Sequence, residues 1–126
     1  MRVLVTGSRT YRNLHQLSAV LGGFYLMFEP DDFDIIQGNA KNGADRLCRK
    51  FCRDAGIKCY GFTANWDKYG KPAGMIRNKR MLTEGQPDLV IAFFAGRTRT
   101  PGTSGMVEYS QRAGLPVWEI LDLESG

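Results

Sequence analysis

Short apolar segments alternate along the chain with longer segments in which apolar residues recur every three or four positions. The short segments predict strands over residues 2–6, 33–37, 57–62, 88–94 and 116–120. The longer segments predict helices over residues 14–28, 44–55, 73–84 and 103–113. The clearest helix is that over residues 44–55, where one continuous apolar stripe ends at Gly56, a residue type that commonly terminates helices. Residues 63–72, between a strand and a helix, are expected to be a loop.

This order of elements predicts one α/β domain with a doubly wound, Rossmann-like architecture. Strands that alternate strictly with helices form a parallel sheet with helices on both faces. For five strands the simplest arrangement is the order 3-2-1-4-5, counted along the chain. A length of 126 residues fits a single domain over residues 1–126, in which residues 121–126 are expected to be a frayed tail.

Composition and charge narrow the class of partner. The longest apolar run, residues 89–95, is far too short to span a membrane, and the amino-terminal segment lacks the features of a secretory signal, so a cytoplasmic protein with no membrane partner is expected. The net charge of +4 suits an anionic small ligand as well as a nucleic acid. Because the chain has no lysine-rich tail or basic run, DNA is the less favoured partner.

The cysteines Cys48, Cys52 and Cys59 are expected to be reduced and to pack in the core. Their odd number argues against a disulfide framework. The chain has no Cys-x-x-Cys motif, its histidine His15 is distant, and Cys48 and Cys52 fall on the apolar stripe of their helix. Buried free cysteine commonly behaves as a small hydrophobe. No metal site is therefore predicted, and no cofactor either, since the patterns of classical dinucleotide and P-loop sites are missing.

Two glycine-bearing loops are predicted to face each other where the strand order reverses, between the first and fourth strands. Ligands of open parallel sheets bind there, and helix starts favour anions through free N–H groups and the helix dipole. These loops supply the candidate ligand-binding residues Gly7, Ser8, Arg9, Gly102, Thr103 and Ser104. The second loop also carries Arg97 and Arg99. The structural alternative is that Gly7 only forms a tight turn and that Thr103 or Ser104 only caps a helix.

Further candidates follow the second strand or lie in the third predicted helix. They are Gly38, Gly43, Asp45, Arg77 and Asn78. Asp45 either hydrogen-bonds a ribose or base, or stabilises the amino terminus of its helix. Arg77, with Arg80 one turn later, either presents its guanidinium to a phosphate or belongs to a solvated basic face. Trp66 and Tyr69 either stack on a base or cover the core.

Together these motifs resemble the YspA-like branch of the SLOG superfamily over nearly the whole chain. The matching residues are Val5-Thr6-Gly7-Ser8-Arg9, Gly38 with Gly43-Ala44-Asp45-Arg46, Ala64-x-Trp66, Ala73-Gly74-x-x-Arg77-Asn78-x-x-Met81, and Gly102-Thr103 with Met106-Val107. The resemblance implies a Rossmann-like fold and a nucleotide or nucleotide-derived ligand. The superfamily includes the Lonely Guy phosphoribohydrolases, DprA-type DNA-binding proteins and domains proposed to sense nucleotide signals. Many members of this branch are phage or prophage proteins. The resemblance therefore implies that this chain could be phage-encoded, in which case the host cytoplasm is its expected location.

One departure from the hydrolase motif bears on catalysis. The hydrolases carry Pro-Gly-Gly-x-Gly-Thr-x-x-Glu, and alignment on Gly102-Thr103 places Met106 where their catalytic glutamate stands. A glycoside hydrolase needs a carboxylate to support the oxocarbenium-like sugar or to activate water. If the chain is an enzyme, Asp45 or Glu108 would have to supply this carboxylate. The resemblance adds Arg77 as a catalytic candidate, because it is a loose match to the hydrolases' catalytic arginine.

The sequence thus predicts binding or sensing of a phosphate-bearing nucleotide or nucleotide-derived small molecule at the strand carboxyl ends. The first alternative is hydrolysis of an N-glycosidic or phosphate-ester bond of a nucleotide. The second is DNA binding of the DprA kind. The sequence leaves open which ligand is bound, whether it is held or cut, and whether the chain forms a homo-oligomer.

Overall fold

The computed structural model describes residues 1–97 and 100–125, and within them strands alternate with helices except between the third and fourth strands, where two helices follow each other. The strands are β1 (Arg2–Gly7), β2 (Asp34–Gln37), β3 (Lys58–Gly61), β4 (Leu89–Ala95) and β5 (Val117–Asp122). The helices are α1 (Leu14–Tyr25), α2 (Ala44–Ala55), α3 (Trp66–Tyr69), α4 (Ala73–Thr83) and α5 (Pro101–Arg112), with 3₁₀ turns η1 (Pro30–Asp32) and η2 (Leu123–Ser125). None of the helices in this described part of the chain is both long and apolar enough to cross a bilayer.

The five strands form one sheet in the order β3-β2-β1-β4-β5, and every neighbouring pair is parallel. This confirms the predicted α/β class and strand order. Val5 pairs with Gln37 of β2 on one side and with Ile91 of β4 on the other. The carboxyl end of β1 therefore lies directly beside that of β4, at the point where the order of the strands reverses.

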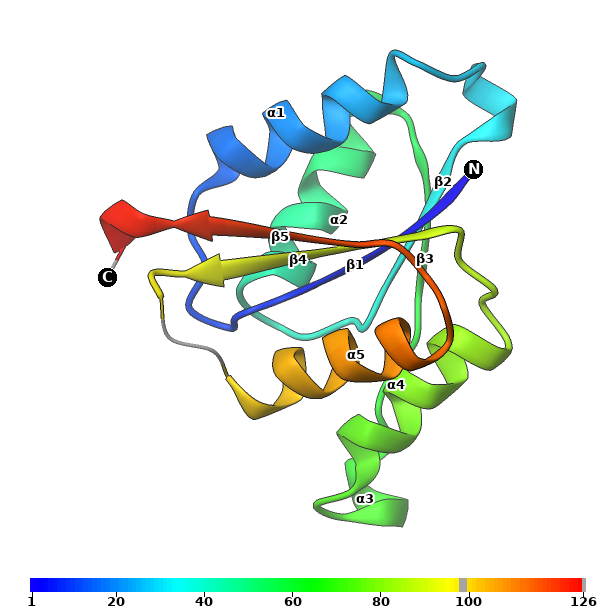
Figure 1. The fold of residues 1–126 in the computed structure, drawn as a ribbon, viewed down its shortest axis with the longest axis vertical. Helices are drawn as coiled ribbons and strands as arrows, with labels where there is room; N and C mark the ends of the chain where they lie inside the picture. The colour runs from blue at the N-terminus through cyan, green and yellow to red at the C-terminus, as the bar shows by residue number, and fades with distance from the viewer. Residues whose placement is uncertain (98–99, 126) are drawn as a thin grey trace.

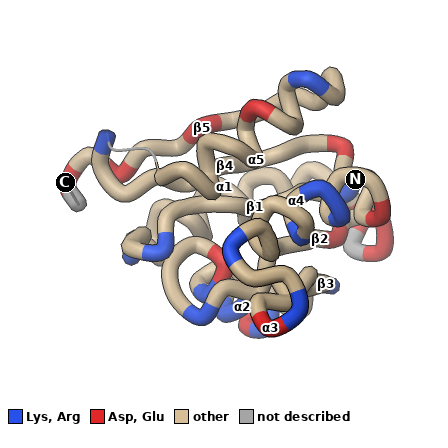
Figure 2. The backbone as a smooth tube through the Cα atoms, turned by 90° about the horizontal axis from the view of Figure 1, so that it is seen from below, with Lys and Arg blue, Asp and Glu red and all other residues tan. Residues whose placement is uncertain are grey.

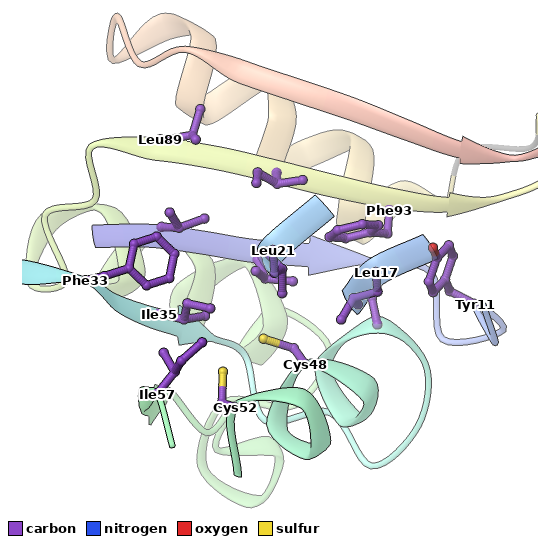
Figure 3. Close-up of a cluster of buried hydrophobic side chains, with 14 residues drawn as sticks. Tyr11, Leu17, Leu21, Phe33, Ile35, Cys48, Cys52, Ile57, Leu89 and Phe93 are labelled. Carbon is purple, nitrogen blue, oxygen red and sulfur yellow. The ribbon is translucent and has the colours of Figure 1, made fainter. Parts of the chain in front are cut away.

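Helices cover both faces of the sheet (Figure 1), and alternate residues of the central strands point into two separate layers of the core. Val3, Val5 and Ile35 face α1 and α2, whose buried side chains join them in the larger hydrophobic cluster (Figure 3). Leu4 and Ile36 point to the other face, where they pack with residues of α4 and α5. This period of two is what a strand covered on both faces requires, and it explains why the central strands read as unbroken apolar runs.

Several expected boundaries need correction. Residues 63–72 are not all loop, because Trp66–Tyr69 form the short helix α3, and the side chain of Asn65 caps it by accepting a hydrogen bond from the backbone N of Lys68 at 3.0 Å. Residues 121–126 are not all a frayed tail, because Leu121 and Asp122 belong to β5 and pair with β4. Helix α5 begins two residues earlier than predicted, with proline at its first position, where a missing N–H costs nothing. Helix α1 ends at Tyr25, three residues before the expected end.

Candidate functional site

Two adjoining cavities lie at the carboxyl ends of β1 and β2. The first, of about 290 Å³, lies between the β1 loop and the start of α5. The second, of about 420 Å³, lies between the β2 loop and α3. Arg9, Ala40 and Arg77 line both. We call the first the inner cavity and the second the outer cavity, and the shared residues make them two parts of one candidate site.

Two glycines allow the β1 loop and the first turn of α2 to lie against each other. A Cβ on Gly43 would stand 2.2 Å from the carbonyl oxygen of Ser8, and Gly43 also has a φ of +79°. A Cβ on Gly7 would stand 2.5 Å from that of Ala44. The close approach lets the Ala44 N–H donate to the Ser8 carbonyl at 3.2 Å. Gly7 and Gly43 therefore shape the floor of the site, and Gly7 also lines the inner cavity.

Ser8 lies behind this floor. It is buried, its N–H donates to the Phe93 carbonyl at 2.9 Å, and its hydroxyl accepts from the Ala95 N–H at 3.4 Å. These contacts join the β1 loop to β4. Ser8 thus uses its polar groups to hold the two strand ends together and lines neither cavity.

Arg77 of α4 spans the boundary between the two cavities. Its Nη1 donates to the carbonyl of Gly38, and its Nε donates to Asn78 Oδ1 at 2.8 Å. A Cβ on Gly38 would lie 2.6 Å from Arg77 Nη1, so glycine is what allows the guanidinium to approach the β2 loop. Burial lowers the pKa of Arg77, the nearby Asp45 carboxyl opposes this, and Arg9 reinforces it. Arginine remains charged at any physiological pH, so Arg77 places a fixed positive charge in the site.

Asp45, in the first turn of α2, is the buried carboxyl of the inner cavity. Asp45 is 8% exposed, and its Oδ2 accepts from the Ala40 N–H at 3.1 Å. Burial raises the pKa of Asp45, while the Ala40 N–H and the positive charges of Arg77 and Arg49 act in the opposite direction. Asp45 therefore combines the two roles considered for it, since it stands at a helix start and also faces the cavity.

The amino terminus of α5 forms the far wall of the inner cavity, through Thr100, Pro101, Gly102 and Thr103. Thr100 stands at the capping position, but its hydroxyl donates to Thr103 Oγ1 at 3.0 Å and makes no capping bond to the backbone. The first N–H groups of a helix have no partner inside the helix. Those of α5 therefore remain available to an acceptor in the cavity, where the helix dipole favours negative charge.

The outer cavity has an aromatic wall. Trp66 is 49% exposed, and the Arg9 guanidinium lies 6.0 Å from the centre of its ring. On the opposite side, Asn39 Nδ2 donates to Thr63 Oγ1 at 2.9 Å, which links the β2 loop to the segment after β3. Asn39 and Thr63 line this cavity although the sequence did not single them out. The available signals were the polar run after the second strand for Asn39 and the polar segment 63–72 after the third strand for Thr63.

The candidate residues thus fall into two groups. Those that line a cavity are Gly7, Arg9, Gly38, Asp45, Arg77, Asn78, Gly102 and Thr103. Ser8, Gly43, Ser104 and Glu108 line neither cavity, and Glu108 is exposed on α5. Met106, at the position of the hydrolase glutamate, is fully buried and packs with Leu4 and Ile36. Arg99 lies outside the described residues.

Comparisons with known proteins identify the family of this chain. The family model described as "YspA, cpYpsA-related SLOG family" matches residues 1–69, which run from β1 to α3. The "Gene 61 protein" of Mycobacterium phage D29 is 32% identical over 123 residues, which are 92% of this chain and 93% of that protein. The chain belongs to the YspA, cpYpsA-related SLOG family. The family predicted from the motifs is confirmed, and the phage relative agrees with the expectation for this branch.

Membership of the SLOG family supports a nucleotide-related ligand or a glycosidase-like activity in general terms. The matched segment contains the β1 loop, the β2 loop and the start of α2, which together supply Arg9, Gly38 and Asp45. The walls contributed by α4 and α5 lie beyond it. The part of the chain that identifies the family is therefore also the part that builds the floor of both cavities.

Proposed function

We propose that this SLOG domain binds a phosphate-bearing nucleotide or nucleotide-derived molecule across the two cavities. The phosphate occupies the inner cavity, between the start of α5 and the guanidinium groups of Arg9 and Arg77. The base occupies the outer cavity and stacks on Trp66. Both cavities are close to the lower end of the range of roughly 300–1,000 Å³ that is typical of small-ligand pockets.

The observation that carries this proposal is that two arginines line both cavities beside an uncapped helix start. A guanidinium donates two parallel hydrogen bonds to a phosphate, and free backbone N–H groups add donors that need no reorganisation. The aromatic face of Trp66 suits any base, because stacking on a ring does not depend on the pattern of donors and acceptors. A ligand with one anionic end and one planar end therefore matches the site at both ends.

The proposal is tested by calorimetric titration with AMP, adenosine and ribose 5-phosphate. Replacing Arg9 or Arg77 by alanine removes a charge-assisted contact and should weaken AMP binding about ten- to hundred-fold. Trp66→Ala should weaken AMP binding but leave ribose 5-phosphate binding nearly unchanged, because the sugar phosphate has no base. Adenosine should bind more weakly than AMP to the unmodified chain.

Arg80 offers a matched control on the same helix as Arg77. It is exposed, pairs with Glu84 at 2.9 Å and lines neither cavity, so Arg80→Ala should leave AMP binding unchanged. If Arg9→Ala and Arg77→Ala bind AMP as tightly as Arg80→Ala does, the site is placed wrongly. If adenosine binds as tightly as AMP, the inner cavity is not a phosphate site.

The buried carboxyl of Asp45 in the inner cavity supports a second candidate function, which is hydrolysis of the N-glycosidic bond of the bound nucleotide. A buried carboxylate beside Arg77 can accept a proton from water while the water oxygen bonds to the sugar C1′ and the C1′–N bond breaks, with its electron pair going to the base. The base nitrogen then takes that proton from Asp45, which restores the carboxylate. Prolonged incubation of AMP with the chain would then release adenine and ribose 5-phosphate.

Chromatography of the incubation mixture distinguishes a protein that only binds AMP from one that hydrolyses it. A binding protein returns AMP intact. A hydrolase accumulates the two products, and Asp45→Asn stops their formation, whereas Glu108→Gln does not, because Glu108 lies outside both cavities. Loss of turnover in Glu108→Gln alone would remove Asp45 from the proposed reaction.

A further inference from the structure

All three cysteines of the chain converge beside α2. Their sulfur atoms lie within 4.8 Å of one another. Cys48 and Cys52 are one turn apart on α2 and therefore share a face of the helix. Cys59 lies on β3 opposite Ile35, a member of the core beneath α2, and so projects toward the same helix. Figure 3 shows the Cys48 and Cys52 side chains in the layer between α2 and the sheet, near Ile35 and Ile57.

A cavity of about 350 Å³ gives access to this cluster. Cys52 and Cys59 line it, together with Arg49 and Asn39. Cys59 is only partly buried, whereas Cys48 is fully buried and closes the inner side of the cluster. The three sulfurs thus form a cup whose open side faces the cavity.

The polar surroundings of Cys59 favour negative charge on its sulfur. Gln37 Nε2 donates to Cys59 Sγ at 3.8 Å, and Arg49 Nη1 donates to Gln37 Oε1 at 3.2 Å. The Gln37 oxygen also accepts from the Asn39 N–H at 2.6 Å, which fixes the amide with its NH₂ group toward the sulfur. Donors of this kind orient thiolate ligands and stabilise their charge. Gln37 Nε2 also donates to Asn39 Oδ1 at 3.3 Å, so the same amide joins the sulfur of Cys59 to the β2 loop.

We propose that Cys48, Cys52 and Cys59 form a three-thiolate site for a thiophilic metal ion such as Zn²⁺. Zinc–sulfur bonds of about 2.3 Å place the sulfurs of a tetrahedral site roughly 3.8 Å apart, so small side-chain rotations suffice to close the cluster. The fourth position faces the cavity and takes water or a small anion. Each thiol gives its proton to solvent and a sulfur lone pair to the metal, no group changes oxidation state, and Arg49 offsets the remaining negative charge.

The test uses the full chain, reduced and stripped of metal, dialysed against chelator-buffered Zn²⁺ under a thiol-free reductant. Elemental analysis should give one zinc per chain. Substitution of Co²⁺ should add the intense near-ultraviolet absorption of thiolate-to-metal charge transfer. Cys59→Ser and Cys52→Ser should each lower zinc affinity by at least about tenfold, since even residues that only support ligands cost 10–100-fold.

Arg53→Ala is the matched control, because Arg53 lines the same cavity, is exposed and offers no ligand to the metal. It should keep one zinc per chain. Circular dichroism and thermal melting establish that each variant is folded. Cys59→Ser should disturb the fold least, because Cys59 is the least buried of the three cysteines. Zinc well below one per chain in the unmodified protein, or equal zinc affinity in Cys59→Ser and Arg53→Ala, would overturn the proposal.

Discussion

The arginine-lined cavities and the cysteine cluster both depend on α2, but they use it in different ways. Asp45, in the first turn, faces the inner cavity, which is built from loops and helix starts. Cys48 and Cys52 follow on the same helix and belong to the main hydrophobic core. The charged groups of the first region have little apolar contact to lose, whereas the cysteines of the second are part of the packing. Substitutions in the first region should therefore weaken ligand binding with little loss of stability. Substitutions in the second region should weaken metal binding and stability together.

The β2 loop connects the two regions. Arg49 donates to the Ala40 carbonyl at 2.7 Å and to the Gln37 side chain at 3.2 Å. Ala40 lines both the inner and the outer cavity, and Gln37 lines the cavity over the cysteines. One guanidinium thus holds a wall of each region in place. This comparison leads to four predictions, which follow in order of decreasing effect.

Gly43→Ala should damage both regions at once. The new Cβ would stand 2.2 Å from the Ser8 carbonyl oxygen at a φ of +79°, so α2 must move away from the β1 loop. Left-handed strain and overpacking together should destabilise the fold by roughly 2–5 kcal/mol. Urea unfolding measures the loss. Gly23→Ala, in α1 with open space around the site of its Cβ, should instead be neutral or stabilising by roughly 0.5–1 kcal/mol. Equal stability of the two variants would show that the floor of the site is not closely packed.

Cys48→Ala should destabilise the protein without changing nucleotide affinity. Cys48 is fully buried in the larger core cluster, so removing its sulfur leaves a small cavity, at a cost of roughly 1–2 kcal/mol. Cys59→Ala, at a partly exposed position, should cost less. Unfolding measured in the absence of metal isolates the packing contribution from any effect of ion binding. A greater loss at Cys59 than at Cys48 would contradict this order.

Asp45→Asn should raise thermal stability at neutral pH. Because the pKa of Asp45 is raised in the folded state, that state holds the proton more tightly than the unfolded chain does, and ionisation opposes folding. The stability gained from this proton is present below the unfolded-state pKa and is lost as the pH rises through the folded-state pKa. Melting curves of both proteins should therefore converge in acid and separate toward neutral pH. A separation that grows in acid would show that Asp45 is held as a stabilising carboxylate.

DNA binding should be weak and strongly dependent on salt. Figure 2 shows Lys and Arg on several separate parts of the chain, most densely around α2 and α3, with Asp and Glu between them. These basic residues do not form one continuous stripe along which a duplex could lie. A protein that contacts many phosphates loses affinity by orders of magnitude over a few-fold rise in salt. Fluorescence anisotropy with duplexes of increasing length should give only micromolar or weaker binding at physiological salt. Tight, length-dependent binding would favour the DNA-binding alternative.

The sequence alone was sufficient for the fold class, the strand order and the family. Strict alternation of apolar strands and helical stripes has one simple parallel arrangement, and it placed the loops after β1 and β4 side by side. The motifs spread over nearly the whole chain, taken together, were enough to identify the family. The apolar stripe of α2 likewise predicted that Cys48 and Cys52 are buried, which the structure confirms.

Only the tertiary structure decided which residues meet. Ser8 and Arg9 are neighbours in sequence, but Ser8 turns into the β1–β4 junction and Arg9 turns toward Trp66. Cys59 joins Cys48 and Cys52 because the register of β3 on β2 directs its side chain toward α2. Periodicity in a sequence reports which face of an element is buried, since burial recurs with the geometry of that element. Contacts between elements depend on strand register and loop path, which are set by packing across the whole domain and leave no periodic signal in the chain.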